Sequence, residues 1–587
     1  MKTITGIVDI YLFYSESNGY SVFKLEDGTS IVGYLPRLNE GDRVELTGNW
    51  VEHPRYGTQF KVESANISYP KTETGIIKYL ASGMIHGIGP VTAKRIVSAF
   101  GEDTIDILDS NISRLIEIEG IGKKKLELIK EGWNEQKSVK NVMLFLQSNG
   151  ISSTYSLKIY KQYGDAAPEL IKNNPYRLIS DIWGIGFKTA DDIGKNLGFT
   201  NSNPFRIKAG VLHVLQQASR DGHVFLPKAE LVKEASYLLQ ADIGYTDILF
   251  DELEESGEIF IHNNKVYIAE FYLAEREIEA SIKRLLSISI ETSTNLTKIL
   301  SSFKEQYSDE QLNAISTSYS EKMLIITGGP GTGKTTTLKG IIQLFQTFDK
   351  KIMLAAPTGR AAKRMTEVIG LEAKTIHRLL EYNPQDNSFN NNEDNPLETD
   401  LLIVDEVSMI DTMLMYNLIV AIGLNTTLIL VGDIDQLPSV GAGNVLKDLI
   451  RSSQIPVIEL NTIFRQAKDS DIIINAHRIN RGEMPALNFL AETDFVFLDE
   501  GTNSKIPEKI LRLCRDELPR KFDFNPVEDI QILSPIYKGD VGVTTLNKLF
   551  QNSLNESAVV YSQGEKTFKA NDKVMQLRNN YDKNVFN

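Results

Sequence analysis

The spacing of hydrophobic positions changes along the chain and predicts three kinds of architecture. Residues 1–70 alternate apolar and polar positions in short runs with glycine-bearing turns, for example over 20–25 and 43–48. Alternation with a period of two is typical of strands, and short strands at regular spacing predict a small β-barrel. Whether this barrel binds a ligand or serves only as a scaffold stays open at this point.

Residues 71–200 show the longer period of amphipathic helices joined by Gly-x-Gly turns, and this region repeats itself. A block over residues 87–122 recurs over 150–186, at an offset of 63 residues that becomes 64 at the last pair of glycines. A fixed offset of this kind indicates an internal duplication, each copy holding two helical hairpins.

The turns themselves suggest a contact with DNA. Each precedes a helix with Lys or Thr in its first turn, as at Lys188 and Thr189. Glycine lets a backbone approach a phosphate, and the free N–H groups of a helix start supply donors. The turns resemble the helix-hairpin-helix motif, which grips the DNA backbone without reading bases. The candidate DNA-binding residues here are Gly87, Gly89, Gly120, Gly122, Gly184 and Gly186. Tight turns in a plain helical bundle remain the alternative for any single copy.

Residues 201–295 read as a winged-helix-like connector, helical first and then β-like. From about residue 296, apolar β-rich runs alternate with helical segments. The runs lie at 323–327, 351–356, 400–404, 427–431, 456–460 and 530–534. Strands alternating with helices predict parallel sheets covered on both faces. We expect two α/β lobes, over 296–452 and 453–587.

The first of these runs leads into a glycine-rich loop with the spacing of a phosphate-binding loop, placed between a strand and a helix. In such a loop the backbone amides cradle a triphosphate, Lys334 reaches the β- and γ-oxygens, and the Thr335 hydroxyl ligates Mg²⁺. The predicted nucleotide-binding residues of the loop are Gly329, Pro330, Gly331, Thr332, Gly333, Lys334, Thr335 and Thr336. ATP and Mg²⁺ are therefore the expected cofactors.

Three later strands precede the remaining candidate catalytic residues. Asp405 and Glu406 follow the run 400–404. An acid there is costly to bury unless it faces a cation, so we expect Asp405 to hold Mg²⁺ and Glu406 to deprotonate the attacking water. Capping of the next helix is the alternative. Gln436, beyond the run 427–431, is a candidate γ-phosphate sensor, and Arg465 is a candidate arginine finger.

Together these motifs resemble superfamily 1 helicases, most closely the stand-alone RecD-like DNA helicases of the RecD/TraA type. Segments 404–409, 432–438 and 464–466 are similar to motifs II, III and IV. The resemblance implies a multidomain fold: an OB-like barrel, helix-hairpin-helix repeats, then RecA-like P-loop motor lobes.

The same resemblance assigns further residues. Segment 307–311 is similar to the adenine-reading Q motif, which implies that Gln311 binds adenine. Segment 356–362 resembles motif Ia, which grips single-stranded DNA, here through Thr358, Gly359 and Arg360. His377 falls in a further DNA-contact segment. A duplex-splitting β-hairpin pin is expected near 381–398, a polar stretch otherwise read as a loop.

The resemblance implies an ATP-dependent helicase that moves 5′→3′ on single-stranded DNA and unwinds forked or tailed duplexes in repair or recombination. A single-stranded-DNA-binding protein is a further candidate partner, and we expect a monomer. Two other classes stay open, an ATP-switched DNA-binding module without processive unwinding and an RNA helicase. The family continues into an SH3-like domain and motifs V and VI, so we expect this chain to be C-terminally incomplete, and hydrolysis by it alone stays open.

Composition limits the number of domains, the disulfides and the cellular location, and it agrees with the helicase-like fold. The 587 residues exceed what one hydrophobic core holds, and a net charge of −14 argues against indiscriminate binding to polyanions. A single cysteine, Cys514, excludes an internal disulfide. The sequence offers neither a long apolar run nor a signal-like N-terminus, so we expect a cytoplasmic protein without a membrane partner.

Overall fold

The computed structural model describes residues 2–15, 20–35, 38, 42–53, 57–68, 72–81, 85–243, 247–290, 296–462, 470–487, 493–563 and 566–576. They belong to two units, residues 1–218 with 225–269 and residues 219–224 with 270–587, each with hydrophobic cores of its own.

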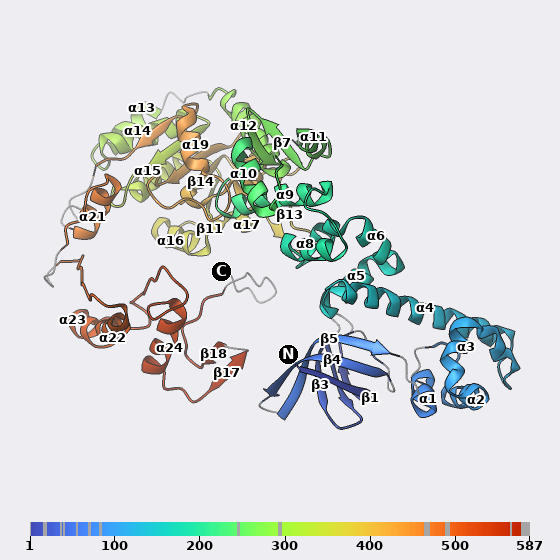
Figure 1. Cartoon of the computed structure of the whole chain (residues 1–587). Coiled ribbons are helices and arrows are strands. Elements are labelled where there is room, and N and C mark those ends of the chain that lie inside the picture. The colour runs from blue at the N-terminus through green and yellow to red at the C-terminus, as the bar shows by residue number, and fades with distance from the viewer. Residues whose placement is uncertain are drawn as a thin grey trace. The chain divides into compact units, whose positions relative to one another are not determined.

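The first five strands close into the predicted barrel, in the order β1-β2-β3-β5-β4. They are β1 (Lys2–Tyr14), β2 (Tyr20–Leu25), β3 (Ser30–Tyr34), β4 (Arg43–His53) and β5 (Gly57–Ser68) (Figure 1). Alternate residues point inward, so that Phe23, Leu25, Leu46 and Phe60 are buried together. The period-two pattern therefore predicts this barrel correctly.

Helices follow the barrel and repeat at the offset seen in the sequence. The first copy holds α2 (Pro90–Phe100), α3 (Thr104–Ser110) and the start of α4 (Lys123–Ser148), after α1 (Glu73–Ala81). The second holds α5 (Ser153–Tyr163), α6 (Ala167–Asn173), α7 (Leu178–Asp181) and α8 (Phe187–Asn196). From α2 to α5 and from α3 to α6 the start moves by 63 residues, and from α4 to α8 by 64.

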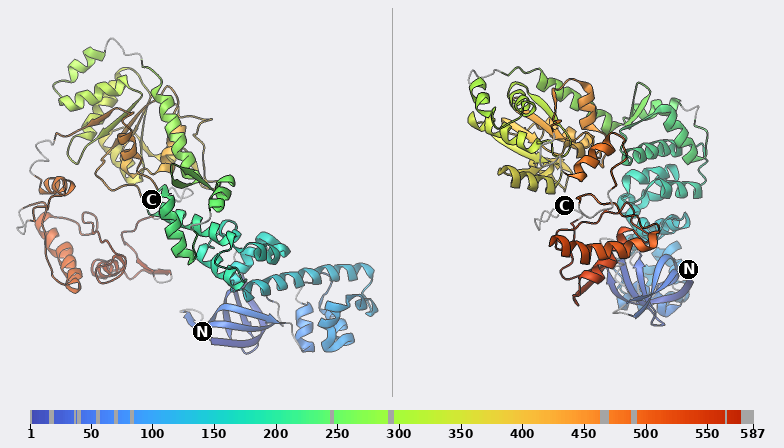
Figure 2. Two further views of the ribbon diagram at one scale, coloured as in Figure 1. Left: turned by 45° about the horizontal axis from the view of Figure 1, so that its top comes forward. Right: turned by 90° about the vertical axis from the view of Figure 1, so that its left-hand side faces the viewer.

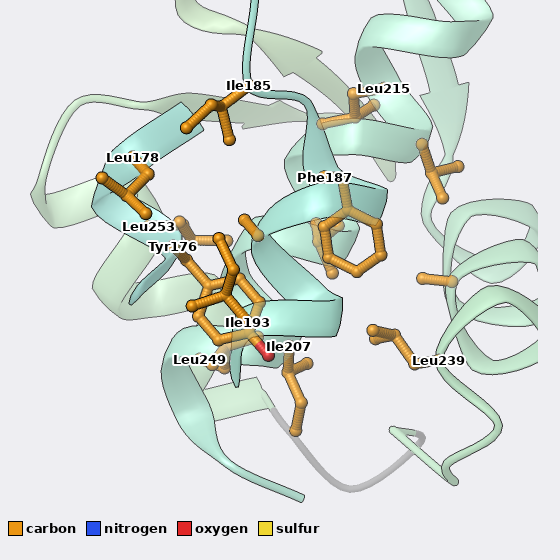
Figure 3. Packing of buried hydrophobic residues seen from close by; sticks show 14 of the residues in the cluster. Tyr176, Leu178, Ile185, Phe187, Ile193, Ile207, Leu215, Leu239, Leu249 and Leu253 are labelled. Atoms are coloured by element: carbon orange, nitrogen blue, oxygen red, sulfur yellow. The ribbon is translucent and has the colours of Figure 1, made fainter. Parts of the chain in front are cut away.

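A helical and β segment completes the first unit. It contains α9 (Pro204–Arg220), β6 (Phe225–Pro227), α10 (Lys228–Leu239), α11 (Asp247–Glu255), β7 (Ile259–His262) and β8 (Lys265–Ile268). The strands form an antiparallel sheet in the order β6-β8-β7. Figure 3 shows how Phe187 and Ile193 of α8 share a core with Leu215 and Leu239.

A buried ion pair ties α8 to α9. Arg206 and Asp191 are 2% and 5% exposed, and the Arg206 Nε lies 2.7 Å from Asp191 Oδ1. The same carboxylate accepts from the Tyr176 hydroxyl, and Arg206 also donates to the carbonyl of Leu239. Burial raises the pKa of Asp191, but hydrogen bonds from Arg206, Lys195 and Tyr176 outweigh it and leave that pKa lowered.

The second unit is built on a six-stranded parallel sheet in the order β11-β10-β14-β15-β9-β16. The strands are β9 (Met323–Thr327), β10 (Ile352–Ala356), β11 (Ala373–Thr375), β14 (Leu401–Val404), β15 (Thr427–Gly432) and β16 (Val457–Glu459). Neighbouring residues of one strand enter different cores, as Ile325 and Ile326 do.

Helices therefore cover both faces of the sheet (Figure 2). One core takes residues of α12 (Ala269–Leu286), α17 (Ile376–Leu379), α18 (Thr412–Val420) and α19 (Val445–Ser452). The other takes residues of α13 (Leu296–Phe303), α14 (Asp309–Ser320), α15 (Lys334–Thr347) and α16 (Gly359–Ile369). The predicted doubly covered α/β architecture is confirmed for this lobe.

Two expectations about the later part of the chain need correction. The strand at 456–460 forms as β16, but it pairs with β9, so the first lobe's sheet extends beyond residue 452, where the sequence placed its end. A strand at 530–534 is wrong: the segment has no strand partner among the described residues, and Leu533 is 87% exposed. An apolar run becomes a parallel strand only where neighbouring strands pair with it.

The described elements after β16 are mainly helical. They are α21 (Asp471–Asn480), α22 (Ile506–Arg512), α23 (Leu518–Phe522), α24 (Val543–Leu554) and the antiparallel pair β17 (Val560–Gln563) and β18 (Lys566–Lys569). Across the parts of the chain that the structure describes, no helix combines the length and apolar character needed to cross a membrane.

Candidate nucleotide site and nucleic-acid interface

Three of the four candidate catalytic residues, Lys334, Glu406 and Gln436, follow the carboxyl ends of three adjacent strands. In the parallel register Val404 of β14 lies beside Leu430 of β15, and Gly432 of β15 lies beside Thr327 of β9. The glycine-rich loop follows Thr327 directly, while Asp405 and Glu406 follow Val404. Segments about 75 residues apart in sequence thus meet at one sheet edge, as open parallel sheets require of a ligand site.

The loop over 328–333 is shaped for close approach by a ligand. Gly331 and Gly333 adopt φ values of 77° and 82°, a region that favours glycine. Lys334 at the start of α15 donates from Nζ to the carbonyls of Gly328 and Gly329. Buried Thr332 donates from Oγ1 to the Gly329 carbonyl at 2.9 Å. The lysine thus lies folded over its own loop.

The donor set fits a magnesium-bound triphosphate. Thr335 and Thr336 are exposed in the first turn of α15, beside the helix N–H groups that favour anions. A hydroxyl from Thr335 and a carboxylate from Asp405 are oxygen ligands of the kind Mg²⁺ prefers. The Thr327 hydroxyl at the end of β9 is buried, and no described residue hydrogen-bonds with it. These features are those of a polar cradle rather than of a packed core.

Electrostatics couple the lysine to both acids. Burial raises the pKa of Asp405, and the backbone N–H of Glu406 and the charges of Lys334 and Arg364 offset this only in part. Burial and the neighbouring charge of Asp405 raise the pKa of Glu406 by more than the charges of Lys334 and Arg364 lower it. A carboxylate with a raised pKa accepts a proton more readily, which suits a general base. Glu406 also has a φ of 54°, in the left-handed region that non-glycine residues seldom adopt and that strains the backbone.

Gln311 lies at the edge of this loop, but its side-chain amide is hydrogen-bonded within the protein, whereas its predicted role is to bind adenine. It is 2% exposed, and its Oε1 accepts from the Ser308 N–H in a capping box at the start of α14. Its Nε2 donates to the Gly333 carbonyl at 3.4 Å. Both ends of the amide are engaged within the protein, so contact with adenine requires an exchange of these bonds.

The two sensor candidates differ in what the structure describes. Gln436 is exposed after β15, and its backbone N–H donates to the Asp433 carbonyl at 3.2 Å. Asp433 is buried and contributes to the raised pKa of Glu406, so the loop of Gln436 adjoins the acids. Arg465 lies outside the described residues.

The structure adds two residues that the sequence reading missed. The charge of Arg364 on α16 acts to lower the pKa of both acids. Arg364 lies one helical turn after Arg360, and this spacing in the sequence already predicts that both lie on one face of the helix. The His477 ring on α21 packs so close to Gly329 that a Cβ there would lie 2.9 Å from its Cε1. Its Nε2 is buried without a hydrogen-bond partner among the described residues. Only tertiary folding brings this histidine to the loop.

The predicted DNA-contact residues of this unit follow the carboxyl ends of two neighbouring strands, β10 and β11. Thr358 caps α16 by accepting from the Ala361 N–H, followed by Gly359 and exposed Arg360. The half-buried His377 ring packs 5.6 Å from Tyr382 and 5.8 Å from Phe389, and burial lowers its pKa. The position is that of a support beneath the hairpin.

That hairpin occupies the stretch where a pin was expected. Strands β12 (Tyr382–Asn383) and β13 (Ser388–Phe389) pair antiparallel, and the Tyr382 hydroxyl donates to Asn387 across the turn. The polar run over 384–387 thus forms a tight turn, so this part of the segment is a hairpin rather than a plain loop.

In the first unit, four similar turns precede α2, α4, α5 and α8. Their first glycines, Gly87, Gly120, Gly150 and Gly184, have φ between 82° and 98°. The isoleucine that follows each is buried: Ile88, Ile121, Ile151 and Ile185. At the second glycines, Gly89, Gly122 and Gly186, an added Cβ would meet no described atom within 4 Å. The isoleucine anchors each turn while the backbone faces outward.

A glycine-rich loop and paired acids at one edge of a parallel sheet define a P-loop nucleotide-binding protein, and the same chain carries a barrel and tandem helical hairpins. Family models agree. Residues 311–442 match an AAA domain, 135–225 the ATP-dependent RecD2 DNA helicase HHH domain, 78–135 a SAM-like helix-hairpin-helix tandem, and 1–70 the OB-fold domain of the ATP-dependent DNA helicase YrrC.

The chain belongs to the ATP-dependent RecD2 DNA helicase family. It is 30% identical over 579 residues to the ATP-dependent RecD2 DNA helicase of Deinococcus radiodurans, an alignment that covers 95% of this chain and 78% of that protein. It is also 37% identical over 195 residues to the RecBCD enzyme subunit RecD of Mycolicibacterium smegmatis, covering 29% of this chain and 35% of that subunit. It is 42% identical over 170 residues to the RecBCD enzyme subunit RecD of Haemophilus influenzae, an alignment that covers 25% of this chain and 27% of that subunit.

Proposed function

We propose that this helicase moves along single-stranded DNA in the 5′→3′ direction and unwinds forked or tailed duplexes during repair or recombination. One observation supports the motor assignment: the loop of Lys334 after β9 and the acids Asp405 and Glu406 after β14 leave the same edge of one parallel sheet. The direction rests on the family resemblance alone.

Within this proposal, Lys334 exchanges the carbonyls of Gly328 and Gly329 for the β- and γ-oxygens of ATP. Magnesium, held through Thr335 and Asp405, would neutralise charge on the phosphates. Glu406 orients the attacking water and takes its proton, a task for which its raised pKa is suited.

The remaining proposed roles connect nucleotide state to DNA. Gln436 senses the γ-phosphate, and Arg465 supplies positive charge to the transferred group. Gln311 reads adenine once its capping bonds exchange. On the DNA side, Thr358, Gly359 and Arg360 hold the single strand, and the hairpin of β12 and β13, supported by His377, separates the duplex.

The hairpin turns of the first unit hold DNA backbone in a manner independent of sequence. Their second glycines leave the backbone open to a phosphate at the starts of α2, α4 and α8. We further propose that the protein acts as a monomer and meets a single-stranded-DNA-binding protein on its substrate.

Strand displacement on a forked duplex with a 5′ tail tests this function. The wild type should displace the strand with ATP, and Lys334→Ala should retain DNA binding but lose ATP hydrolysis and displacement. ATP-dependent changes in affinity without displacement would instead favour an ATP-switched binding module. Preference for a 3′ tail would overturn the direction, and equal stimulation of hydrolysis by RNA would reopen the choice of nucleic acid.

A further inference from the structure

The four hairpin turns share a backbone conformation but differ at the residue before the first glycine. That residue is His86, Glu119, Asn149 or Trp183 in chain order. Trp183 is 88% exposed, although tryptophan is mostly buried in folded proteins. The other two tryptophans, Trp50 and Trp133, are 44% and 1% exposed. One turn of the four thus presents a large aromatic ring to solvent.

Contacts from α5 hold the backbone beneath this ring. The Tyr155 hydroxyl donates to the Gly184 carbonyl at 2.6 Å, and Lys158 Nζ donates to the Trp183 carbonyl at 3.0 Å. The same ammonium lies 5.1 Å from the centre of the Trp183 ring and 5.6 Å from that of Tyr155. A cation and two aromatic rings therefore lie side by side at the turn.

The first copy has the same scaffold without the ring. Arg95, 63 residues before Lys158, donates from Nη1 to the carbonyl of Glu119 at 2.9 Å. In the first copy the side chain before the first glycine is the acid Glu119, which repels phosphate. In the second copy it is the indole of Trp183, beside the Lys158 ammonium. The duplicated turns therefore present opposite chemistry at one equivalent position.

We propose that Trp183, flanked by Lys158, is a stacking site for an unpaired DNA base beside the backbone grip of Gly184 and Gly186. An aromatic face takes any base, and a neighbouring cation suits the adjoining phosphate, the combination that single-strand binding surfaces use. Lys188, in the first turn of α8 directly after the two glycines, is exposed and adds a second positive charge to this segment. The ligand is a single strand or a frayed duplex end, and the inference rests on the proposed contact of these turns with DNA.

Tryptophan fluorescence tests this site directly. Titrating the whole protein with a thymidine 20-mer should quench emission in the wild type, and Trp183→Ala should abolish most of that quench. The same substitution should weaken single-strand binding about tenfold, while affinity for a blunt duplex changes less than twofold. Trp183→Phe should restore most of the affinity. Tyr237→Ala, at an equally exposed aromatic of α10, serves as the control and should change neither signal.

Moving the tryptophan to the equivalent turn of the first copy provides a second test. Glu119→Trp in the Trp183→Ala protein places the ring on the matching turn and should restore part of the quench. Unchanged quenching and affinity in Trp183→Ala would overturn the inference, as would equal quenching by single strand and blunt duplex, since the indole would then touch backbone rather than a base. If the wild type binds neither DNA, the proposed hairpin contact itself fails.

Discussion

Two regions of this chain place glycine turns at helix starts and are proposed to bind phosphate, yet they are built in opposite ways. In the nucleotide loop the glycines are enclosed: a Cβ at Gly328 would lie 2.6 Å from the Leu460 carbonyl, and one at Gly329 would touch His477. At the second hairpin glycines, such as Gly186, a Cβ would meet no described atom within 4 Å.

The contrast follows from the ligands. In the account proposed here, a triphosphate that must react is surrounded by side chains from several elements, and the charge of Lys334 acts to lower the pKa of both Asp405 and Glu406. A long polymer that must slide is contacted from one side, so we expect the hairpins to offer open backbone N–H groups with lysines beside them, as at the start of α4. Changes of side chain should therefore damage the first region most, and added bulk on the backbone the second.

The largest effect is expected in the enclosed site. Glu406→Gln should reduce ATP hydrolysis about 10³-fold, because removing a positioned general base costs this order of magnitude. Affinity for a non-hydrolysable ATP analogue should fall less than threefold, and DNA affinity should not change. Steady-state hydrolysis and equilibrium titration measure the two quantities. Hydrolysis within tenfold of the wild type would remove Glu406 from the catalytic role.

Next in size is the scaffold of the second hairpin copy. Asp191→Asn should lower the free energy of unfolding by about 3 kcal/mol, since it leaves the buried charge of Arg206 without its partner. Glu117→Gln, in an exposed pair with Arg114, should cost less than about 1 kcal/mol. Chemical denaturation with fluorescence detection compares the two.

The same pair makes a pH prediction. Because the folded-state pKa of Asp191 is lowered, its contribution to stability is present above the unfolded-state pKa of about 3.9 and is lost as pH falls below it. The difference in stability between wild type and Asp191→Asn should shrink through that range. A difference independent of pH would contradict the account of the pair.

A moderate effect is expected at the open turns. Gly122→Val and Gly186→Val should each weaken duplex binding about tenfold at low salt and reduce the salt slope by about one, because bulk at the turn displaces one phosphate contact. ATP hydrolysis without DNA should remain unchanged. If affinity and slope both persist in the folded variants, the turns are structural only.

The smallest effect distinguishes, within one turn, backbone strain at Gly184 from steric blocking of DNA at Gly186. Gly184→Ala should cost about 1 kcal/mol of stability, since Gly184 has φ 98°, whereas Gly186→Ala should cost less than about 0.5 kcal/mol. For DNA binding the order should reverse, with Gly186→Ala the weaker binder. Thermal unfolding and duplex titration give both comparisons.

Features set by local pattern could be predicted from the sequence. The barrel follows from period-two alternation, the hairpin repeat from its offset, and the loop of Lys334 from spacing between a strand and a helix. The capping box of Ser308 and Gln311 also matched a readable local signal, although the sequence reading assigned Gln311 to adenine instead.

Features set by tertiary contact could not. The run at 530–534 resembles a buried strand, but a strand exists only with partners that sequence does not supply. His477 reaches the nucleotide loop from an element about 150 residues away. The exposure of Trp183 depends on which side of its turn packs into the core, where Ile185 lies.

The central claim is that Lys334 and Asp405 act on one magnesium-bound triphosphate. The most direct measurement is a double-mutant cycle for binding of a non-hydrolysable ATP analogue with Mg²⁺, using Lys334→Ala, Asp405→Asn and both together. We predict that the double variant binds little worse than the weaker single variant, because the two side chains serve one ligand. Losses that simply multiply would show that the two side chains act independently of each other and would contradict the account.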